Sequence, residues 1–131
     1  MKFWIGNLGK TATVGVAFCQ LITKGKKMGV HVFIVPLRDP KSHRALPGLT
    51  IGDCGAKVGM HGIDNGWLVF KDFRIPKDNL LDRIGQVQED GTYVSDIPDK
   101  NKRFGLTLGA LSGGRAKIGV TTTTWKIGLG F

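Results

Sequence analysis

The stretch Val30-His31-Val32-Phe33-Ile34-Val35 carries apolar side chains on both faces of an extended chain. A strand of this kind is typical of a position covered on both sides, inside a sandwich or beneath a neighbouring domain. Residues 11–22 predict a second such strand. One of its faces carries Val14, Val16, Phe18 and Ile22, and the other carries Ala17, Cys19 and Leu21. Between the two strands, Lys24-Gly25-Lys26-Lys27 predicts a hairpin connection.

Short strands and turns follow along the chain. Residues 49–51 predict a strand, and Asp64-Asn65-Gly66 predicts a turn into another strand over residues 67–70. Pro76 ends that region, and residues 77–81 predict a single helical turn. Glycine supplies 20 of the 131 residues, roughly twice its ordinary share of ~7%. The sequence therefore predicts a mainly β fold, built as a small antiparallel β-barrel or sandwich.

The last third has a different pattern. Residues at three- and four-residue spacing favour a helix, namely Phe104, Leu108, Leu111, Ile118, Thr122, Trp125 and Leu129. Each glycine in this stretch costs about 1 kcal/mol relative to alanine, so the helix would need tertiary packing. Gly105, Gly109 and Gly113 form a flat stripe that another backbone could approach. Because nothing after Phe131 caps this helix, we expect the chain to be one piece of a longer protein.

Length and charge narrow the function classes. A chain of 131 residues can form one domain with a modest core but not a complete two-domain enzyme. Its formal charge of +9 comes from basic ends around an acidic middle. This permits a negatively charged partner, although solubility is the simpler explanation. No export signal or membrane-spanning segment is evident, so we expect Cys19 and Cys54 to be free, buried thiols in a reducing compartment.

The chain offers few candidates for catalysis or metal binding. His31, His43 and His61 match no recognised metal-ligand spacing, so no metal site is expected. No triad context surrounds Ser95 or Ser112, and no catalytic residue is assigned. Residues 6–11 resemble the end of a phosphate-binding loop. The two glycines are too close together and no strand precedes them, so we regard this match as false.

One segment near the N-terminus suits a flat ligand. Lys2-Phe3-Trp4-Ile5-Gly6 places an aromatic ring next to flexible backbone. A ring beside exposed backbone N–H and C=O groups suits a heteroaromatic ligand with hydrogen-bonding edges, such as a flavin. The alternative is an ordinary edge strand that ends in a turn, and the residues alone favour that alternative.

Several blocks of residues occur together in a specific order. They are residues 2–11 (KFWIGNLGKT), 29–38 (GVHVFIVPLR), 47–53 (PGLTIGD), 63–66 (IDNG), 74–81 (RIPKDNLL) and 90–94 (DGTYV). These blocks resemble the middle β domain of the peroxisomal acyl-CoA oxidases, and the likeness extends over roughly residues 2–118. Arg103-Phe104-Gly105 and Leu111-Ser112-Gly113-Gly114-Arg115 most resemble the branched-chain, pristanoyl-type oxidases.

The resemblance implies an FAD enzyme of peroxisomal fatty acid β-oxidation, which converts acyl-CoA and O₂ into trans-2-enoyl-CoA and H₂O₂. It implies that residues 1–101 form the middle β-barrel domain, as in acyl-CoA dehydrogenases and oxidases. Residues 102–131 would begin the C-terminal helical region. The remaining helical domains of the parent chain would help to enclose the flavin and the acyl-CoA. The full-length enzyme is expected to be a homodimer.

The same resemblance points to site residues. Gly6 lies at the position of the family's flavin-contacting glycine, and Trp4 and Ile5 match the residues that flank the isoalloxazine ring. Related dehydrogenases usually have threonine at the position of Gly6, and oxidases often have a second glycine at the position of Asn7. The family's catalytic carboxylate lies in the C-terminal region and is absent from this chain. We therefore expect the chain alone to be inactive and to bind FAD poorly.

Two alternatives remain open. The chain could be the middle domain of an acyl-CoA dehydrogenase, although the block at residues 90–94 favours an oxidase. A basic β-barrel that binds nucleic acid is also permitted by the charge of +9. Most of the eleven aromatic residues, seven Phe, three Trp and one Tyr, fall in expected core strands rather than in an exposed stacking row. We therefore expect neither a nucleic-acid partner nor a membrane span.

Overall fold

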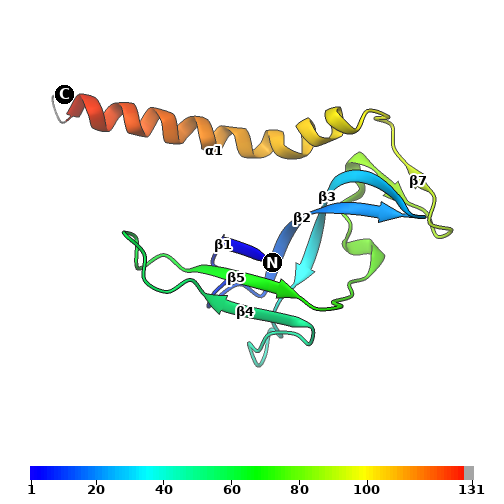
Figure 1. Ribbon diagram of the computed structural model, residues 1–131, viewed down its shortest axis with the longest axis horizontal. Helices are drawn as coiled ribbons and strands as arrows, with labels where there is room; N and C mark the ends of the chain where they lie inside the picture. Colours follow the sequence, from blue (N-terminus) through cyan, green and yellow to red (C-terminus); the bar gives the residue numbers. More distant parts are fainter. Residues whose placement is uncertain (129–131) are drawn as a thin grey trace. The chain divides into compact units, whose positions relative to one another are not determined.

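The computed structural model describes residues 1–128, and it describes their side chains except at positions 110, 111 and 118–128. The elements are β1 (Lys2–Gly6), β2 (Val14–Thr23), β3 (Lys26–Pro36), β4 (Leu49–Asp53), β5 (Asn65–Phe70), η1 (Lys77–Asn79), η2 (Asp82–Ile84), β6 (Gln86–Val87), β7 (Tyr93–Val94) and α1 (Lys100–Gly128) (Figure 1). The mainly β fold that the sequence predicts for the part before α1 is confirmed.

The strands described pair into three separate sheets. One sheet has the order β1-β5-β4, and the other two pair β2 with β3 and β6 with β7. Among the strands of residues 1–128 these pairings do not close into a barrel. The predicted hairpin is present, and its turn is tighter than the four residues expected. Lys24 and Gly25 both have positive φ, at 47° and 72°, which is the type I′ geometry that matches the twist of paired strands.

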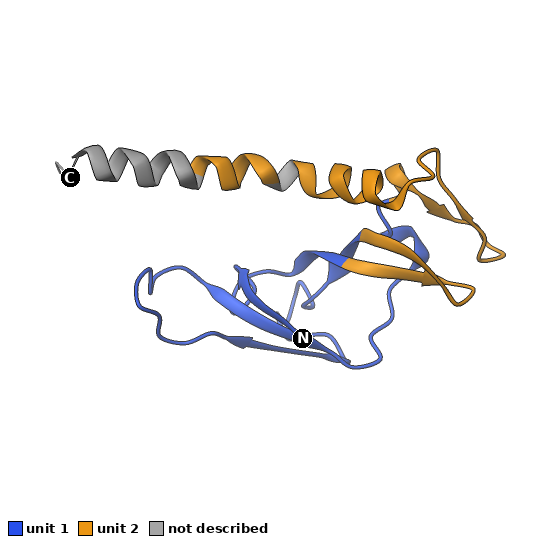
Figure 2. Cartoon of the chain, turned by 45° about the horizontal axis from the view of Figure 1, so that its top comes forward, with its two compact units in different colours: residues 1–18, 32–81 blue, residues 19–31, 82–131 orange. Residues whose placement is uncertain are grey.

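The chain divides into two compact units, coloured separately in Figure 2. Unit 1 consists of Met1–Phe18 and Val32–Leu81, and unit 2 consists of Cys19–His31 and Asp82–Phe131. Strands β2 and β3 therefore each run from one unit into the other.

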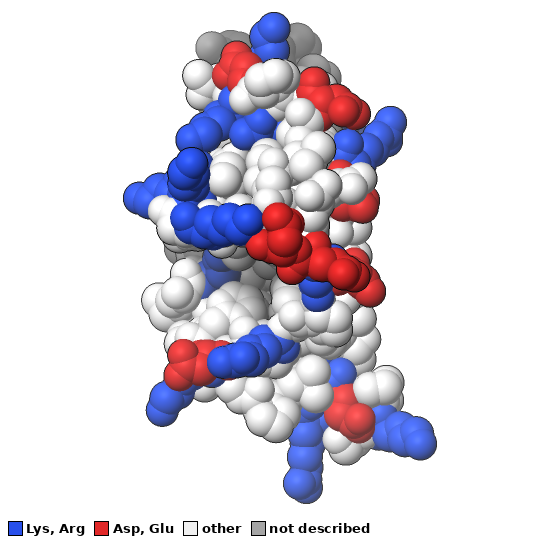
Figure 3. All heavy atoms as spheres, turned by 90° about the vertical axis from the view of Figure 1, so that its right-hand side faces the viewer, with Lys and Arg blue, Asp and Glu red and all other residues white. Residues whose placement is uncertain are grey.

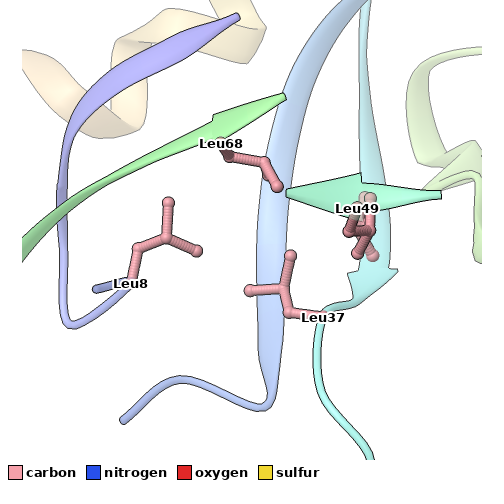
Figure 4. Packing of buried hydrophobic residues seen from close by; sticks show 5 residues of the cluster. Leu8, Leu37, Leu49 and Leu68 are labelled. Carbon is pink, nitrogen blue, oxygen red and sulfur yellow. The ribbon is translucent and has the colours of Figure 1, made fainter. Parts of the chain in front are cut away.

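Unit 1 is built around an apolar core. Leu8, Val35, Leu37, Leu49 and Leu68 are buried, and Figure 4 shows the four leucines pointing toward one another. They come from the loop after β1, the end of β3, and strands β4 and β5. Complete burial of one such side chain stabilises the fold by about 1.5–3 kcal/mol. This cluster therefore fixes the position of the loop after β1 against β4 and β5.

The pairing of β1 with β5 contains a bulge. Lys2 pairs with Leu68 and Ile5 pairs with Gly66, so three steps along β1 match only two steps along β5. A β-bulge of this kind adds one residue to the strand and so changes which side chains point outward. Trp4 has a φ of 62° within this bulge, a left-handed conformation that is unfavourable for a bulky residue.

A close approach of two backbones follows the bulge. A Cβ atom built on Gly66 would lie 2.3 Å from the backbone nitrogen of Gly9 and 2.7 Å from its Cα atom. Only glycine at position 66 leaves room for the loop after β1 to lie directly on β5.

Unit 2 buries polar side chains instead. His31 is 0% exposed, and its Nδ1 and Nε2 atoms lie 3.1 Å from the carbonyl oxygen of Gly29 and 2.9 Å from the hydroxyl of Tyr93. Arg103, 4% exposed, places its guanidinium carbon 5.3 Å from the centre of the Tyr93 ring. It donates to the carbonyl oxygens of Met28 (3.0 Å), Pro98 (3.0 Å) and Ile97.

The predicted helix is confirmed, and it begins at Lys100, ahead of Phe104. The carboxylate of Asp99 accepts the N–H of Asn101 at 2.8 Å, which caps the first turn. A Cβ atom placed on Gly105, Gly109 or Gly113 would have no atom of the described residues within 4 Å, so the expected stripe is open. Among the residues of the helical pattern, the side chains at 111, 118, 122, 125 and 129 lie outside those described. No helix within residues 1–128 has the length and apolar character needed to cross a bilayer.

Two expectations about burial need correction. Strand β2 was expected to be covered on both faces, but Val14, Val16 and Ile22 are exposed. Cys19 and Cys54 are free, as expected, but each is half-buried rather than buried.

Candidate functional site

The bulge in β1 presents two aromatic rings to solvent. Trp4 is 59% exposed and Phe3 is 49% exposed, and their ring centres lie 5.4 Å apart in an edge-to-face arrangement. Gly6 is also exposed, and a Cβ atom built on it would have no atom of the described residues within 4 Å. We call residues 4–6 the N-terminal strip. It combines an accessible indole ring with backbone that a flat ligand can approach closely.

The middle residue of the N-terminal strip faces inward. Ile5 is half-buried and lines an apolar cavity of about 210 Å³ in unit 1. The other lining residues are Lys2, Leu8, Gly15, Val16, Ala17, Phe18, Val35, Leu37, Leu68 and Phe70. The Nζ atom of Lys2 donates to the carbonyl oxygen of Phe18 at 3.0 Å. Ile5 therefore anchors the strip to the core while its two neighbours remain exposed.

The loop after the strip is held by one aspartate. We call residues 7–12 the glycine loop. The backbone N–H of Asn7 donates to the carbonyl oxygen of Asp64 at 2.8 Å. The backbone N–H groups of Lys10 and Thr11 donate to the Oδ2 atom of the same residue at 2.9 and 3.3 Å. Strand β1 does precede the loop, contrary to the expectation from the sequence. The carboxylate nevertheless occupies the N–H groups that a phosphate would need, which supports the rejection of a phosphate-binding loop.

The hydrogen bonds of Asp64 also affect its ionisation. Burial raises the pKa of Asp64, but the N–H groups of Lys10, Thr11 and Gly9 and the hydroxyl of Thr11 together lower it by more. The pKa therefore lies below the usual value of an aspartate. The charged form is the one that fits the loop, because a carboxylate accepts several N–H groups at once.

The carbonyl groups of the glycine loop have partners as well. Arg38 is buried, and its guanidinium donates to the carbonyl oxygens of Ala12 at 2.7 Å and Gly9 at 2.9 Å. The Nε2 atom of His43 lies 2.9 Å from the carbonyl oxygen of Lys10. A planar guanidinium that bonds two carbonyl groups fixes their separation. The loop is therefore held from both sides by residues distant in the sequence.

Other candidates from the sequence have structural roles. The hydroxyl of Ser95 donates to the carbonyl oxygen of Ile84 at 2.6 Å, and that of Ser112 donates to Gly109 at 2.6 Å. Within the part of the chain that the structure describes, no three His, Cys, Asp or Glu side chains could share a metal ion. The face in Figure 3 carries acidic side chains among the basic ones.

Of the three site residues expected from the sequence, Trp4 and Gly6 are exposed, and Ile5 between them is half-buried. The sequence analysis missed Asp64 and Arg38. Asp64 lies directly before the Asn65-Gly66 turn, and both residues fall within the sequence blocks 63–66 and 29–38, but no local pattern indicates which backbone groups they bind. Both act on distant backbone groups, between 26 and 54 residues along the chain.

Comparison with known proteins adds a second line of evidence. No family model matches the chain. The peroxisomal acyl-coenzyme A oxidase 2 of Arabidopsis thaliana is 56% identical over 127 residues, which cover 90% of this chain. The chain corresponds to one segment of the peroxisomal acyl-CoA oxidases. The human peroxisomal acyl-coenzyme A oxidase 3 is 49% identical over 118 residues, or 89% of this chain. The matched regions make up 18% and 17% of these two oxidases, so the chain spans less than a fifth of their length.

Solved oxidase structures contain the same fold. Acyl-CoA oxidase 1 of Yarrowia lipolytica matches with a TM-score of 0.77 and 42% identity, over 86% of this chain and 16% of that one. Acyl-CoA oxidase 1 of Caenorhabditis elegans, complexed with FAD and ATP, matches with a TM-score of 0.69 and 48% identity. That match covers 74% of this chain and 15% of the nematode oxidase chain. The family resemblance predicted from the sequence blocks is confirmed.

Proposed function

We propose that this chain is the middle β domain and following helix of an FAD-dependent, peroxisomal acyl-CoA oxidase. Residues 1–101 would form the middle domain, and residues 102–131 would begin the C-terminal helical region. The identity of 56% over 127 residues with a peroxisomal oxidase supports the family part of this proposal. The reaction would convert acyl-CoA and O₂ into trans-2-enoyl-CoA and H₂O₂ in fatty acid β-oxidation.

The exposed N-terminal strip carries the proposal at the level of the site. A flavin presents a flat ring with hydrogen-bonding edges, and such a ring needs an accessible surface beside free backbone. Trp4 offers an indole ring that is 59% exposed, and Gly6 leaves the space of a side chain open. The residues present therefore fit one wall of a flavin pocket.

Each residue of the strip has a separate task in this proposal. Bound FAD would accept the electrons of the acyl-CoA and pass them to O₂. Trp4 would cover part of the isoalloxazine ring and exclude water from it, because a large aromatic side chain buries much area with little loss of side-chain entropy. Gly6 would let the backbone approach the ring, and Ile5 would hold both neighbours against the core. The carboxylate that takes the α-proton would come from another part of the enzyme.

The finer parts of the proposal concern substrate and assembly. The motifs Arg103-Phe104-Gly105 and Leu111-Ser112-Gly113-Gly114-Arg115 favour an oxidase of the branched-chain, pristanoyl type. The uncovered face of β2, with Val14 and Val16 exposed, supports contact with the helical domains of the parent chain. We propose that the full-length enzyme is a homodimer that binds acyl-CoA and uses O₂ directly.

The test is made on the full-length protein that contains this chain. It should purify with the visible absorption of bound FAD and release H₂O₂ from acyl-CoA, with the fastest turnover on a 2-methyl-branched acyl-CoA. A protein without flavin would contradict the proposal. Oxidation that requires an added electron acceptor and consumes no O₂ would favour the dehydrogenase alternative.

Trp4→Leu tests the wall itself. Loss of the exposed ring should raise the dissociation constant for FAD about tenfold, because an aromatic contact and its buried area contribute on the order of 1.5 kcal/mol. Val58→Ala is the matched control, since Val58 is an exposed apolar residue of unit 1 outside the strip. Equal FAD affinity in both variants would show that the strip is not part of the pocket.

A further inference from the structure

We propose that Asp64 is a positioning residue for the proposed flavin pocket. Its carboxylate fills the glycine loop and so fixes the N-terminal strip, which forms one wall of that pocket. This inference rests on the proposed function, since the wall is part of that proposal. It assigns a role to a residue that lies outside the N-terminal strip.

Asp64 holds the loop at both ends. Its carbonyl oxygen accepts the N–H of Asn7, the residue directly after Gly6, at 2.8 Å. Its Oδ2 atom accepts the N–H groups of Lys10 and Thr11 at 2.9 and 3.3 Å, and the hydroxyl of Thr11 lies 3.4 Å from the same atom. One residue of the chain therefore closes the loop across its whole length.

The fit of the carboxylate is tight. A Cβ atom built on Gly9 would lie 2.6 Å from the Oδ1 atom of Asp64, so any larger residue at position 9 would push the carboxylate out. The same Oδ1 atom is buried and has no hydrogen-bond partner among the described residues. A buried polar oxygen without a partner is unfavourable for the fold. This unfavourable burial indicates that the carboxylate matters through the hydrogen bonds that its Oδ2 atom accepts from Lys10 and Thr11.

The strip needs such support because its backbone is strained. Trp4 has a φ of 62°, and non-glycine residues in this region persist only where the surroundings hold them. The pairing of Lys2 with Leu68 holds the strip on its N-terminal side. On the other side it is held by the pairings of Ile5 with Gly66 and of Gly6 with Asn65, and the bond from Asn7 to the carbonyl of Asp64 continues them. Loss of the carboxylate's bonds to Lys10 and Thr11 would loosen the loop that follows Gly6, and with it the end of β1 that carries the strip.

Asp64→Asn in the full-length enzyme tests the inference. This substitution keeps the volume but removes the charge that the loop N–H groups bind. We expect the dissociation constant for FAD to rise about tenfold, the effect of losing a charge-assisted hydrogen bond. The absorption spectrum of the bound flavin should shift, and the amides of Lys10 and Thr11 should exchange hydrogen faster in the apo-protein. Thr11→Val removes the hydroxyl that lies 3.1 Å from the carbonyl oxygen of Asn7 and 3.4 Å from the Oδ2 atom of Asp64, and it should raise the dissociation constant two- to threefold, by roughly 0.5 kcal/mol.

Asp53→Asn is the matched control. The carboxylate of Asp53 lies beside the same loop, 3.7 Å from the Nζ atom of Lys10, in an exposed ion pair that contributes little. Its variant should bind FAD as the wild type does.

The outcomes separate the two proposals. If the wild type contains FAD and neither Asp64→Asn nor Thr11→Val changes the FAD affinity or the flavin spectrum, the role of Asp64 is wrong and the proposed function stands. If Asp64→Asn does not fold, Thr11→Val alone decides in the same way. A wild-type enzyme without FAD overturns the proposed function, and this inference with it.

Discussion

Unit 1 and unit 2 bury different kinds of side chain. All six apolar side chains that are fully buried among the described residues belong to unit 1: Leu8, Val35, Leu37, Leu49, Leu68 and Leu80. In unit 2 the large buried side chains are His31 and Arg103, joined through the ring and hydroxyl of Tyr93. One unit is thus held mainly by apolar packing, and the other by directional polar contacts.

The two kinds of interior differ in how they fix the positions of loops and side chains. Apolar packing has no preferred direction, so in unit 1 the position of the glycine loop is set by close contacts at its glycines together with the hydrogen bonds of Asp64 and Arg38. Hydrogen bonds and cation–π contacts need defined geometry, so unit 2 depends on the presence of each polar partner. We therefore expect substitutions at the close-packed glycines of unit 1 to act by steric clash, and substitutions of the buried polar side chains of unit 2 to act by loss of a partner.

The largest effect is expected in unit 1, for Gly66→Ala. The new methyl group would lie 2.3 Å from the backbone nitrogen of Gly9, and backbone cannot move aside as a flexible side chain can. We expect the free energy of unfolding to fall by about 3 kcal/mol, the upper part of the range for overpacking. Urea denaturation measures this change. Gly62→Ala is the control, because nothing lies within 4 Å of that position, and a similar loss there would remove the steric explanation.

A smaller effect is expected in unit 2, for Arg103→Met. Methionine replaces most of the buried volume but leaves the carbonyl oxygens of Met28 and Pro98 without their donor. We expect a loss of about 2 kcal/mol in the free energy of unfolding, within the range for an unsatisfied buried acceptor. The same substitution at the exposed neighbour Lys102 should change stability by less than about 0.5 kcal/mol. Equal losses at the two positions would contradict the polar interior of unit 2.

The smallest effect depends on pH and concerns His31. Because a carbonyl oxygen only accepts, Nδ1 of His31 carries the proton toward Gly29, and Nε2 accepts from Tyr93. Burial lowers the pKa of His31, and the charge of Arg103 lowers it further against the opposing effect of the Gly29 carbonyl. The unfolded chain therefore binds a proton at a higher pH than the folded chain. Stability from His31 is complete above its unfolded pKa of about 6.5 and declines as the pH falls below it.

His31→Gln tests this dependence. At pH 7.5 the variant should be less stable by about 1 kcal/mol, through the lost hydrogen bond with Tyr93. The difference should shrink between about pH 7 and pH 5.5, because only the wild type loses stability by protonation of the unfolded state. Thermal unfolding across this pH range measures the difference. His61→Gln, at an exposed position, is the control: its difference in stability from the wild type should not shrink over this pH range as that of His31→Gln does. A difference for His31→Gln that is constant with pH would show that burial does not perturb this histidine.

Much of the fold follows from local sequence patterns. The apolar run of residues 30–35 and the Lys24-Gly25 turn predict the β2–β3 hairpin, and the three- and four-residue spacing after Phe104 predicts α1. Residues 49–51 and 67–70 lie in β4 and β5, as predicted. These elements are predictable because strand and helix periodicity depend on residues close in the sequence. The exposure of Val14 and Val16 was not predictable, since an apolar pattern does not show what covers it.

The candidate site was predictable only in part. The sequence places an aromatic residue before Gly6, but it does not show that a bulge turns Trp4 outward, because a bulge depends on the register between β1 and β5. It likewise does not show that the carboxylate of Asp64 enters the glycine loop 54 positions earlier in the chain.

The sequence by itself determined the kinds of local structure in this protein, a set of short strands followed by a helix, and the family to which its blocks correspond. Only the tertiary structure decided which side chains face solvent and which backbone groups a distant carboxylate or guanidinium binds. The reason is physical: periodicity acts within a few residues, whereas register, burial and the partner of a polar group are set by segments that meet only when the chain folds.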